Sequence, residues 1–227
     1  MVFSRSFARF MLLALTVSSM VTGCVNAPEP APRPVRTATT WNPPAAPESR
    51  MCLANLSQTY ANFTPLADQY FGAGCSAVGA VRIASLRSDS GLLQISNLGP
   101  VTCPLANTLS GWARFGVDRA ARAILGSPLV RIETMGSYAC RNVAGTSRLS
   151  AHASANAVDV SGFVLADGRR ISVLRDWDSE DPQIRAFLAT IRSSACKRFG
   201  TVLSPQYNAA HRDHFHLEVG GGSPFCQ

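Results

Sequence analysis

The amino-acid sequence predicts an α+β domain in which helices flank a small antiparallel sheet. Short runs of β-branched and apolar residues alternate with stretches whose apolar residues have helical spacing, in mixed order along the chain. Turn sequences typical of hairpins, such as Asp167-Gly168, separate neighbouring predicted strands. Hydrophobic residues make up 46% of the chain and charged residues 15%, so there is enough apolar area to bury a core.

The first half of the predicted domain contains two helices and a hairpin. Apolar residues at helical spacing predict a helix within Met51–Tyr70, which Pro65 should break or restart. Two short strands, Ala80–Leu86 and Leu92–Ser96, surround a Ser-Asp-Ser-Gly turn. Pro104–Leu125 has one apolar face and is expected to form a helix that packs on the sheet.

The second half is richer in strands and contains one further helix. Asp181 is a candidate N-cap and Pro182 suits the first turn, so we expect a helix from there to about Phe199. The expected strands are Leu129–Tyr138, Ala157–Leu165, Arg170–Leu174, Thr201–Leu203 and His214–Val219.

The N-terminus has the pattern of an export signal. Arg5 and Arg9 precede an apolar run over 10–21, which is shorter than the ~20 residues that span a membrane. Small residues directly before Cys24 resemble the lipobox of bacterial lipoproteins. We expect removal of residues 1–23 as a lipoprotein signal peptide and acylation of Cys24; cleavage nearby with Cys24 unmodified is the alternative.

The organisation after that signal is a tether followed by one domain. Residues 24–50 are rich in proline, and such segments are extended at ~3.1 Å per residue. No aspartate follows Cys24, so we expect anchoring in the outer rather than the inner membrane, with the domain of residues 51–227 in the periplasm. We expect this domain to be monomeric.

The chain has seven cysteines, and an even number remains once Cys24 is set aside. In an exported protein this predicts three disulfides, although free buried thiols are the alternative. Six cysteines allow fifteen pairings, and the sequence does not choose among them. The cysteines concerned are Cys52, Cys75, Cys103, Cys140, Cys196 and Cys226.

The charge is mildly basic. The formal net charge is +7, and loss of Arg5 and Arg9 with the signal leaves about +5. No Lys/Arg run or basic amphipathic helix is present, and aromatic residues make up 8%, so nucleic-acid binding is not expected. Attraction to an anionic envelope or substrate fits this charge better.

All four histidines fall in two short clusters, which we interpret as a metal site. His152 lies in a loop of small residues seven positions before Asp159, whose side chain should point away from the core. In the predicted strand 214–219, His214, His216 and Glu218 share one face. Two imidazoles and a carboxylate suit a catalytic Zn²⁺ with water at the fourth position. The alternative is that His152 and Asp159 only hydrogen-bond each other.

These motifs carry a family resemblance. Ser150-x-His152-x6-Asp159 followed by His214-x-His216 resembles the signature of the LAS zinc metallopeptidases, which include D-Ala-D-Ala carboxypeptidases and peptidoglycan endopeptidases. More closely, the segments 136–141, 150–159 and 211–216 resemble the bacterial extensin-like C-terminal domain family, over roughly Met51 to Cys226. The resemblance implies a LAS-type peptidase fold, with His152, Asp159 and His216 as zinc ligands.

The resemblance also implies catalytic roles. Relatives use as the base either the first histidine of the HxH motif, here His214, or a glutamate three residues before the last ligand, a position that Asp213 occupies here. Aspartate is one methylene shorter, and on an alternating strand it would point away from His216, so we favour His214. Arg141 matches an arginine that holds a substrate carboxylate or polarises the scissile carbonyl, while a surface arginine is the alternative. Weaker candidates for supporting the ligands are Ser150, His211 and Glu218.

One departure from the carboxypeptidase pattern is Ala155, where glycine is favoured. We expect alanine to exclude a backbone conformation with positive φ there, with consequences for substrate fit. The expected function is an envelope-anchored zinc metallopeptidase that hydrolyses amide bonds in peptidoglycan stem peptides or crosslinks. The alternatives are a non-catalytic peptidoglycan-binding or structural lipoprotein and a periplasmic metal carrier.

Overall fold

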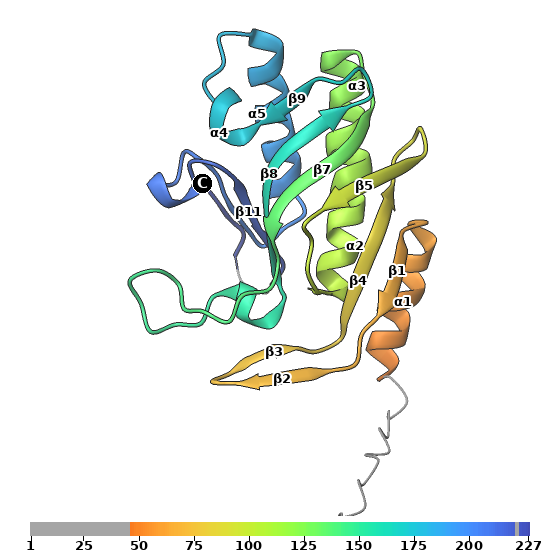
Figure 1. Ribbon diagram of the computed structural model, residues 1–227, viewed down its shortest axis with the longest axis vertical. Coiled ribbons are helices and arrows are strands. Elements are labelled where there is room, and N and C mark those ends of the chain that lie inside the picture. Colours follow the sequence, from red (N-terminus) through yellow and green to blue (C-terminus); the bar gives the residue numbers. More distant parts are fainter. Residues whose placement is uncertain (1–45, 221–222) are drawn as a thin grey trace, which may run out of the picture. The chain divides into compact units, whose positions relative to one another are not determined.

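The computed structural model describes residues 46–220 and 223–227, which fall within one compact unit (Figure 1). The predicted signal peptide, Cys24 and most of the predicted tether lie outside the described residues. Across 46–220 and 223–227, no helix is both long and apolar enough to cross a membrane.

The described residues form one large sheet, a small hairpin and several helices. The strands of the large sheet are β1 (Asn62–Pro65), β4 (Ala80–Arg87), β5 (Leu92–Ser96), β6 (Val101–Thr102), β7 (Leu129–Gly136), β8 (Ala157–Leu165), β9 (Arg170–Ser172), β10 (Thr201–Leu203), β11 (Phe215–Glu218) and β12 (Phe225–Cys226). The separate hairpin consists of β2 (Gln69–Gly72) and β3 (Cys75–Ala77). The helices are α1 (Pro47–Gln58), α2 (Cys103–Gly111), the π-helical η1 (Trp112–Asp118), α3 (Arg119–Leu125), α4 (Val173–Asp176), α5 (Pro182–Cys196) and the 3₁₀ turns η2 (Ala151–Ser154) and η3 (Ala209–His211).

The α+β class is confirmed, but the prediction of a small antiparallel sheet is wrong. The sheet has ten strands within the described residues, in the order β1-β4-β5-β7-β8-β11-β10-β12, with β6 beside β4 and β9 beside β8. It is mixed, because β5 pairs with β7 in parallel and β10 pairs with β12 in parallel. The helices α2 to α3 carry the chain from β5 to β7, and such a crossover is what a parallel neighbour requires.

The predicted helix 104–125 is present with a π-helical interior. Thr102 caps its start through its hydroxyl, and Gly126 ends it in the left-handed conformation with φ of 69°. The last predicted helix begins as expected, because the Asp181 carboxylate accepts a hydrogen bond from the backbone N–H of Gln183 at 2.8 Å. It ends at Cys196, before the predicted Phe199.

Other predicted elements differ in their bounds; β7 ends at Gly136 and not at Tyr138, and β11 is shorter than predicted by one residue at each end. The first helix, α1, begins at Pro47 inside the predicted tether and ends at Gln58, after which the chain forms β1 and the β2–β3 hairpin. Strand β9 ends at Ser172 and not at Leu174. The reason is local: the Asp176 carboxylate accepts a hydrogen bond from the backbone N–H of Ser172 at 2.7 Å and starts α4.

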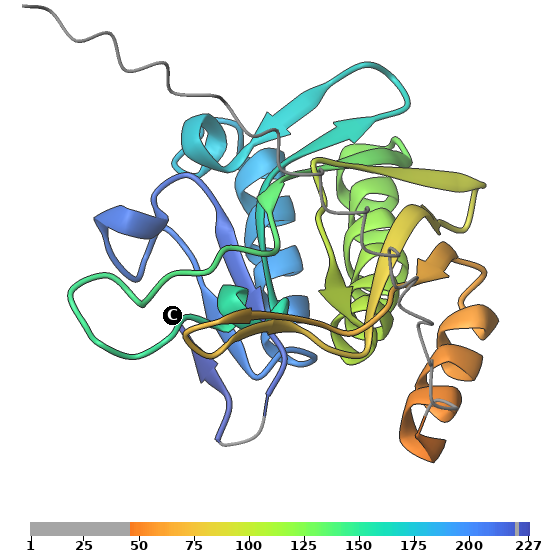
Figure 2. The same cartoon turned by 60° about the horizontal axis from the view of Figure 1, so that its bottom comes forward.

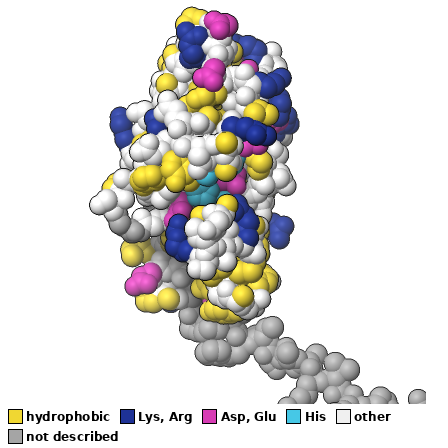
Figure 3. All heavy atoms as spheres, turned by 90° about the vertical axis from the view of Figure 1, so that its left-hand side faces the viewer, with side chains coloured by type: hydrophobic (Ala, Val, Ile, Leu, Met, Phe, Trp, Pro, Cys, Tyr) yellow, Lys and Arg dark blue, Asp and Glu magenta, His cyan; other side chains and the backbone are white. Residues whose placement is uncertain are grey.

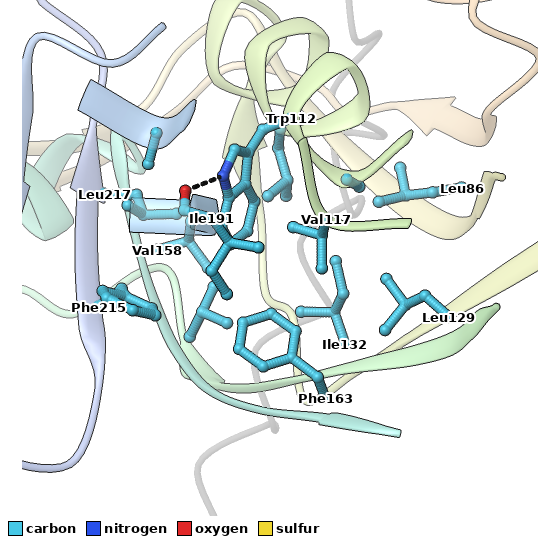
Figure 4. Close-up of a cluster of buried hydrophobic side chains, with 14 of the residues drawn as sticks. Leu86, Trp112, Val117, Leu129, Ile132, Val158, Phe163, Ile191, Phe215 and Leu217 are labelled. Atoms are coloured by element: carbon cyan, nitrogen blue, oxygen red, sulfur yellow. Dashed lines mark hydrogen bonds between the residues drawn. The ribbon is translucent and has the colours of Figure 1, made fainter. Parts of the chain in front are cut away.

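One face of the sheet is covered by helices and encloses the core. Phe163 on β8 contacts Trp112 on η1 and Phe187 on α5, at ring-centroid distances of 6.2 and 5.6 Å. Trp112 satisfies its indole N–H by donating to the carbonyl of Ile191 at 2.9 Å, which locks η1 to α5 (Figure 4). Figure 2 shows α2 and α3 in green and α5 in blue gathered on the same side of the strands.

The three predicted disulfides are confirmed, and their pairing is now defined: Cys52–Cys103, Cys75–Cys140 and Cys196–Cys226. The first joins α1 to α2. The second joins β3 to the loop between β7 and η2, and the third fastens β12 to the end of α5. Each bridge closes a loop of the unfolded chain and thereby removes conformational entropy from it.

Candidate metal centre

The site is built on the face of β8 and β11 opposite the core. Asp159 on β8 and His216 on β11 lie directly across from each other in the antiparallel pairing. Their neighbours Val158, Val160 and Leu217 are fully buried on the helix side. Because side chains alternate along a strand, the residues that fill the core also fix the direction of the carboxylate and the imidazole.

His152 reaches the same point from η2, just before β8. The Ser150 side chain caps this turn by accepting from the backbone N–H of His152 at 3.4 Å. Ala155 ends the turn with φ of 55°. The expectation that alanine would exclude positive φ there is therefore wrong: the fully buried Ala155 carries the left-handed conformation, and its N–H closes the turn onto the carbonyl of His152 at 3.1 Å.

Three potential ligand atoms converge at this point. His152 Nε2 lies 3.2 Å from Asp159 Oδ1 and 3.2 Å from His216 Nδ1, while His216 Nδ1 lies 3.0 Å from Asp159 Oδ1. Tetrahedral zinc with bonds of ~2.0–2.1 Å places its ligand atoms roughly 3.3 Å apart. The spacing of His152, Asp159 and His216 therefore fits a zinc ion with little rearrangement.

Outer hydrogen bonds orient both imidazoles toward the centre. The His152 Nδ1–H donates to the carbonyl oxygen of Ser137 at 2.8 Å, and a carbonyl can only accept, so Nε2 of the neutral ring carries its lone pair inward. Glu218 Oε2 lies 3.5 Å from His216 Nε2 and favours the tautomer with Nδ1 facing inward. Two lone pairs and a carboxylate then face one another, an arrangement that a bound cation or a proton would stabilise.

The pKa values of Asp159 and His216 reflect their mutual contacts. Burial alone would raise the pKa of Asp159, but its close contacts with the His152 and His216 imidazoles outweigh burial and hold the pKa well below its usual range. Burial alone would lower the pKa of His216, yet its hydrogen bonds with Asp159 and Glu218 raise that pKa to about 9. Without metal, a proton on His216 thus takes the place of the cation at the centre.

His214 lies beside the three ligand atoms, just before β11 begins. Its Nε2 is 3.6 Å from Asp159 Oδ1, and its Nδ1 is 2.8 Å from Asp213 Oδ1. Asp213, in the preceding turn, is therefore paired with His214. Asp213 was expected on an alternating strand, but it lies in a turn before β11, where its carboxylate orients the imidazole of His214.

His211 extends the cluster outward. Its Nδ1 lies 2.7 Å from Asn208 Oδ1, and its ring centroid lies 5.2 Å from that of His214 and 6.0 Å from that of His216. Burial, followed by repulsion from His214 and His216, lowers the pKa of His211 to about 4. His211 is therefore a neutral polar group at the rim of the site near pH 7.

Arg141 is exposed on the loop between β7 and η2. Its carbonyl oxygen accepts from the backbone N–H of Ser150 at 3.0 Å, which ties this part of the loop to the start of η2. Among the interactions of the described residues, none joins its guanidinium to the ligand cluster. The histidine side chains are visible in a hollow of the surface, with acidic and basic side chains at its edge (Figure 3).

Comparison with known families decides the classification. A family model described as Extensin-like protein C-terminus matches residues 50–227. The chain belongs to this extensin-like family. The matched region contains all three disulfides, the ligand cluster and His214, so the described domain is the extensin-like domain. No curated protein and no solved structure matches the chain.

Sequence reasoning missed several contributors to this site. The carbonyl of Ser137, which orients His152, leaves no trace in the sequence because every residue has a carbonyl. Asn208 and Tyr207 contact His211 from the turn before η3, and the only available signal was their position shortly before the second histidine cluster.

Proposed function

We propose that this extensin-like protein is a zinc-dependent peptidase that hydrolyses amide bonds in peptidoglycan stem peptides or crosslinks. The observation that carries the proposal is the convergence of His152 Nε2, Asp159 Oδ1 and His216 Nδ1, all within 4.8 Å of one another. Three protein ligands from imidazole and carboxylate are the donor set of catalytic zinc sites, which keep the fourth position for water.

The proposed chemistry divides between the ion and the chain. Bound Zn²⁺ supplies a Lewis acid that lowers the pKa of water toward ~7 and polarises a carbonyl. His214 is the proposed general base: Asp213 accepts from its Nδ1–H, which leaves Nε2 free to take the proton of the attacking water. Asp213 then stabilises the imidazolium, and His214 returns the proton to the leaving amine.

Burial supports this assignment of roles. His214 is 8% exposed, so its pairing with Asp213 is only partly screened by water. Asp213 serves as a positioning residue in this proposal. A LAS-type peptidase fold is part of the same proposal. Exposed Arg141 is proposed to hold a carboxylate of the substrate once the substrate is bound.

The substrate and location follow from the resemblance to LAS peptidases together with the N-terminal sequence. We propose acylation of Cys24, a lipid anchor in the outer membrane, and a tether that lets a periplasmic monomer reach the cell wall. Three disulfides are consistent with an oxidising compartment. The net positive charge favours approach to an anionic polymer.

The test is digestion of purified peptidoglycan by the zinc-loaded protein, beside His216→Ala and His214→Ala, with released fragments identified by mass spectrometry. We expect fragments from the parent protein alone, with zinc retained by His214→Ala and lost by His216→Ala. The new termini would name the bond and distinguish carboxypeptidase from endopeptidase. Stoichiometric zinc without any cleavage, across several wall types, would favour the non-catalytic binding protein.

A further inference from the structure

A row of aromatic rings leads from the ligand cluster to the edge of the sheet. His211 contacts Tyr207 at a centroid distance of 5.4 Å, and Tyr207 contacts Phe225 at 5.8 Å with the rings nearly perpendicular. Tyr207 and Phe225 are 43% and 44% exposed. An exposed aromatic pair that adjoins a polar cluster is a candidate binding surface.

The register of the strands explains why Phe225 lies on the face of the sheet that carries Asp159 and His216. Val202 on β10 is opposite Leu217 and buried in the core, so its neighbour Leu203, which is opposite His216, lies on the other face. On β12, Cys226 pairs with Val202 and is bridged to α5, whereas Phe225 pairs with Thr201 on the metal face. Period-two alternation therefore turns the cysteine toward the helices and the phenylalanine toward the site.

Backbone hydrogen bonds and a disulfide hold the segments that carry Tyr207 and Phe225. The backbone N–H of Phe225 donates to the carbonyl of Gly200 at 2.8 Å, and that of Tyr207 donates to the carbonyl of Ser204 at 2.9 Å. The Ser204 hydroxyl in turn donates to the Gln227 carbonyl at 2.8 Å, joining the two segments. Together with the Cys196–Cys226 bridge, these bonds present the two rings with little ordering entropy left to lose on binding.

We propose that Tyr207 and Phe225 form a subsite for a sugar ring of the glycan strand to which the stem peptide is attached. A pyranose has an apolar C–H face and a rim of hydroxyls, which match exposed aromatic faces beside the Tyr207 hydroxyl and the His211 ring. The proposal rests on the proposed function and deepens it, because it makes glycan-linked peptide the preferred substrate.

The separation from the metal centre suits such a ligand. Tyr207 is two ring contacts from His216, at 6.0 and 5.4 Å, and Phe225 is one contact further, at 5.8 Å. The two rings of the subsite therefore lie at most about three and about five extended residues from His216. A short stem peptide whose amide bond lies at the metal centre therefore brings its attached sugar to this distance.

The test measures binding, so that it does not depend on turnover. The zinc-loaded protein carrying His214→Ala is titrated by calorimetry with a disaccharide-linked stem peptide and with the same peptide lacking the sugars. Phe225→Ala, Phe225→Tyr and Tyr207→Ala are compared in that background. Phe115→Ala is the matched control, because Phe115 is similarly exposed, at 46%, but lies in the helix layer on η1.

We expect the disaccharide-linked peptide to bind at least about fivefold more tightly than the free peptide, an advantage lost in Phe225→Ala and Tyr207→Ala and kept in Phe225→Tyr and Phe115→Ala. Equal affinity for the two ligands, or equal losses for both ligands in Phe225→Ala, would overturn the subsite. Hydrolysis of peptidoglycan by the parent protein is scored separately, so a failed subsite and a failed peptidase proposal give different results.

Discussion

The two faces of strands β8 and β11 place opposite demands on neighbouring residues. On the helix side, Val158, Val160, Phe215 and Leu217 are fully buried among apolar side chains. On the other side, Asp159 and His216 lie at hydrogen-bond distance from each other. The apolar face stabilises the fold because many residues together bury apolar surface. The function proposed for the polar face depends instead on the positions of a few nitrogen and oxygen atoms.

This difference teaches how the fold carries the site. Burying a carboxylate and imidazoles is unfavourable unless they are paired. The polar face, which carries Asp159 and His216, therefore adds little net stability without a cation. The apolar face supplies the rigidity that holds the ligand atoms 3.0–3.2 Å apart. Substitutions on the two faces should therefore separate stability from metal binding.

The largest effect is expected on the apolar face. Phe163→Ala removes a ring that is fully buried between Trp112 and Phe187, and should lower the free energy of unfolding by about 3–5 kcal/mol. Urea unfolding of the zinc-free protein measures this. A loss below about 1 kcal/mol would contradict the assignment of Phe163 to the core.

Removal of a ligand should give the next largest effect. His152→Ala should weaken zinc binding at least about 100-fold, since two ligands hold the ion poorly. Excess zinc raises the Tm of the parent protein by binding only the folded state, and this rise should disappear in the variant. Phe115→Ala serves as the control that keeps the rise. An unchanged zinc affinity in His152→Ala would remove this residue from the ligand set.

A smaller effect on zinc affinity is expected at Glu218, which contacts the proposed ligand His216. Glu218 accepts from His216 Nε2, and Glu218→Ala should weaken zinc binding about tenfold without changing its stoichiometry. Glu218→Gln keeps an acceptor and should lose less. Competition with a chromogenic chelator gives both affinities. The prediction fails if the glutamine variant binds zinc more weakly than the alanine variant.

The smallest effect, on the free energy of unfolding, is expected at Asp89, which lies on neither face of β8 and β11. Hydrogen bonds from Arg114 and then Arg119 lower the pKa of exposed Asp89. A lowered folded-state pKa contributes stability above the unfolded value near 3.8, and this contribution is lost as pH falls through the folded value. Asp89→Asn should therefore be slightly less stable than the parent near pH 7, with the difference shrinking below about pH 4. Thermal unfolding across that range checks the sign.

The two faces of these strands could largely be predicted from the sequence, because the alternation of side chains along a strand depends only on neighbouring residues. The strands Leu92–Ser96, Ala157–Leu165 and Thr201–Leu203 have the predicted bounds, and the two histidine clusters do meet. The extent and mixed direction of the sheet could not be anticipated, since pairing of β10 with β12 depends on where a distant segment docks. Likewise, the pairing of Asp213 with His214 depends on a turn before β11 that strand periodicity does not describe.

The Cys75–Cys140 bridge implies an order of maturation. Cys140 lies three positions after Ser137, whose carbonyl orients His152, and the bridge fixes this loop to β3. A chain still in a reducing compartment would lack that restraint, so we expect it to capture metal less well; zinc titration with and without reductant would show the difference. For the exported zinc peptidase proposed above, formation of this bridge would delay assembly of the metal centre until the chain reaches an oxidising compartment.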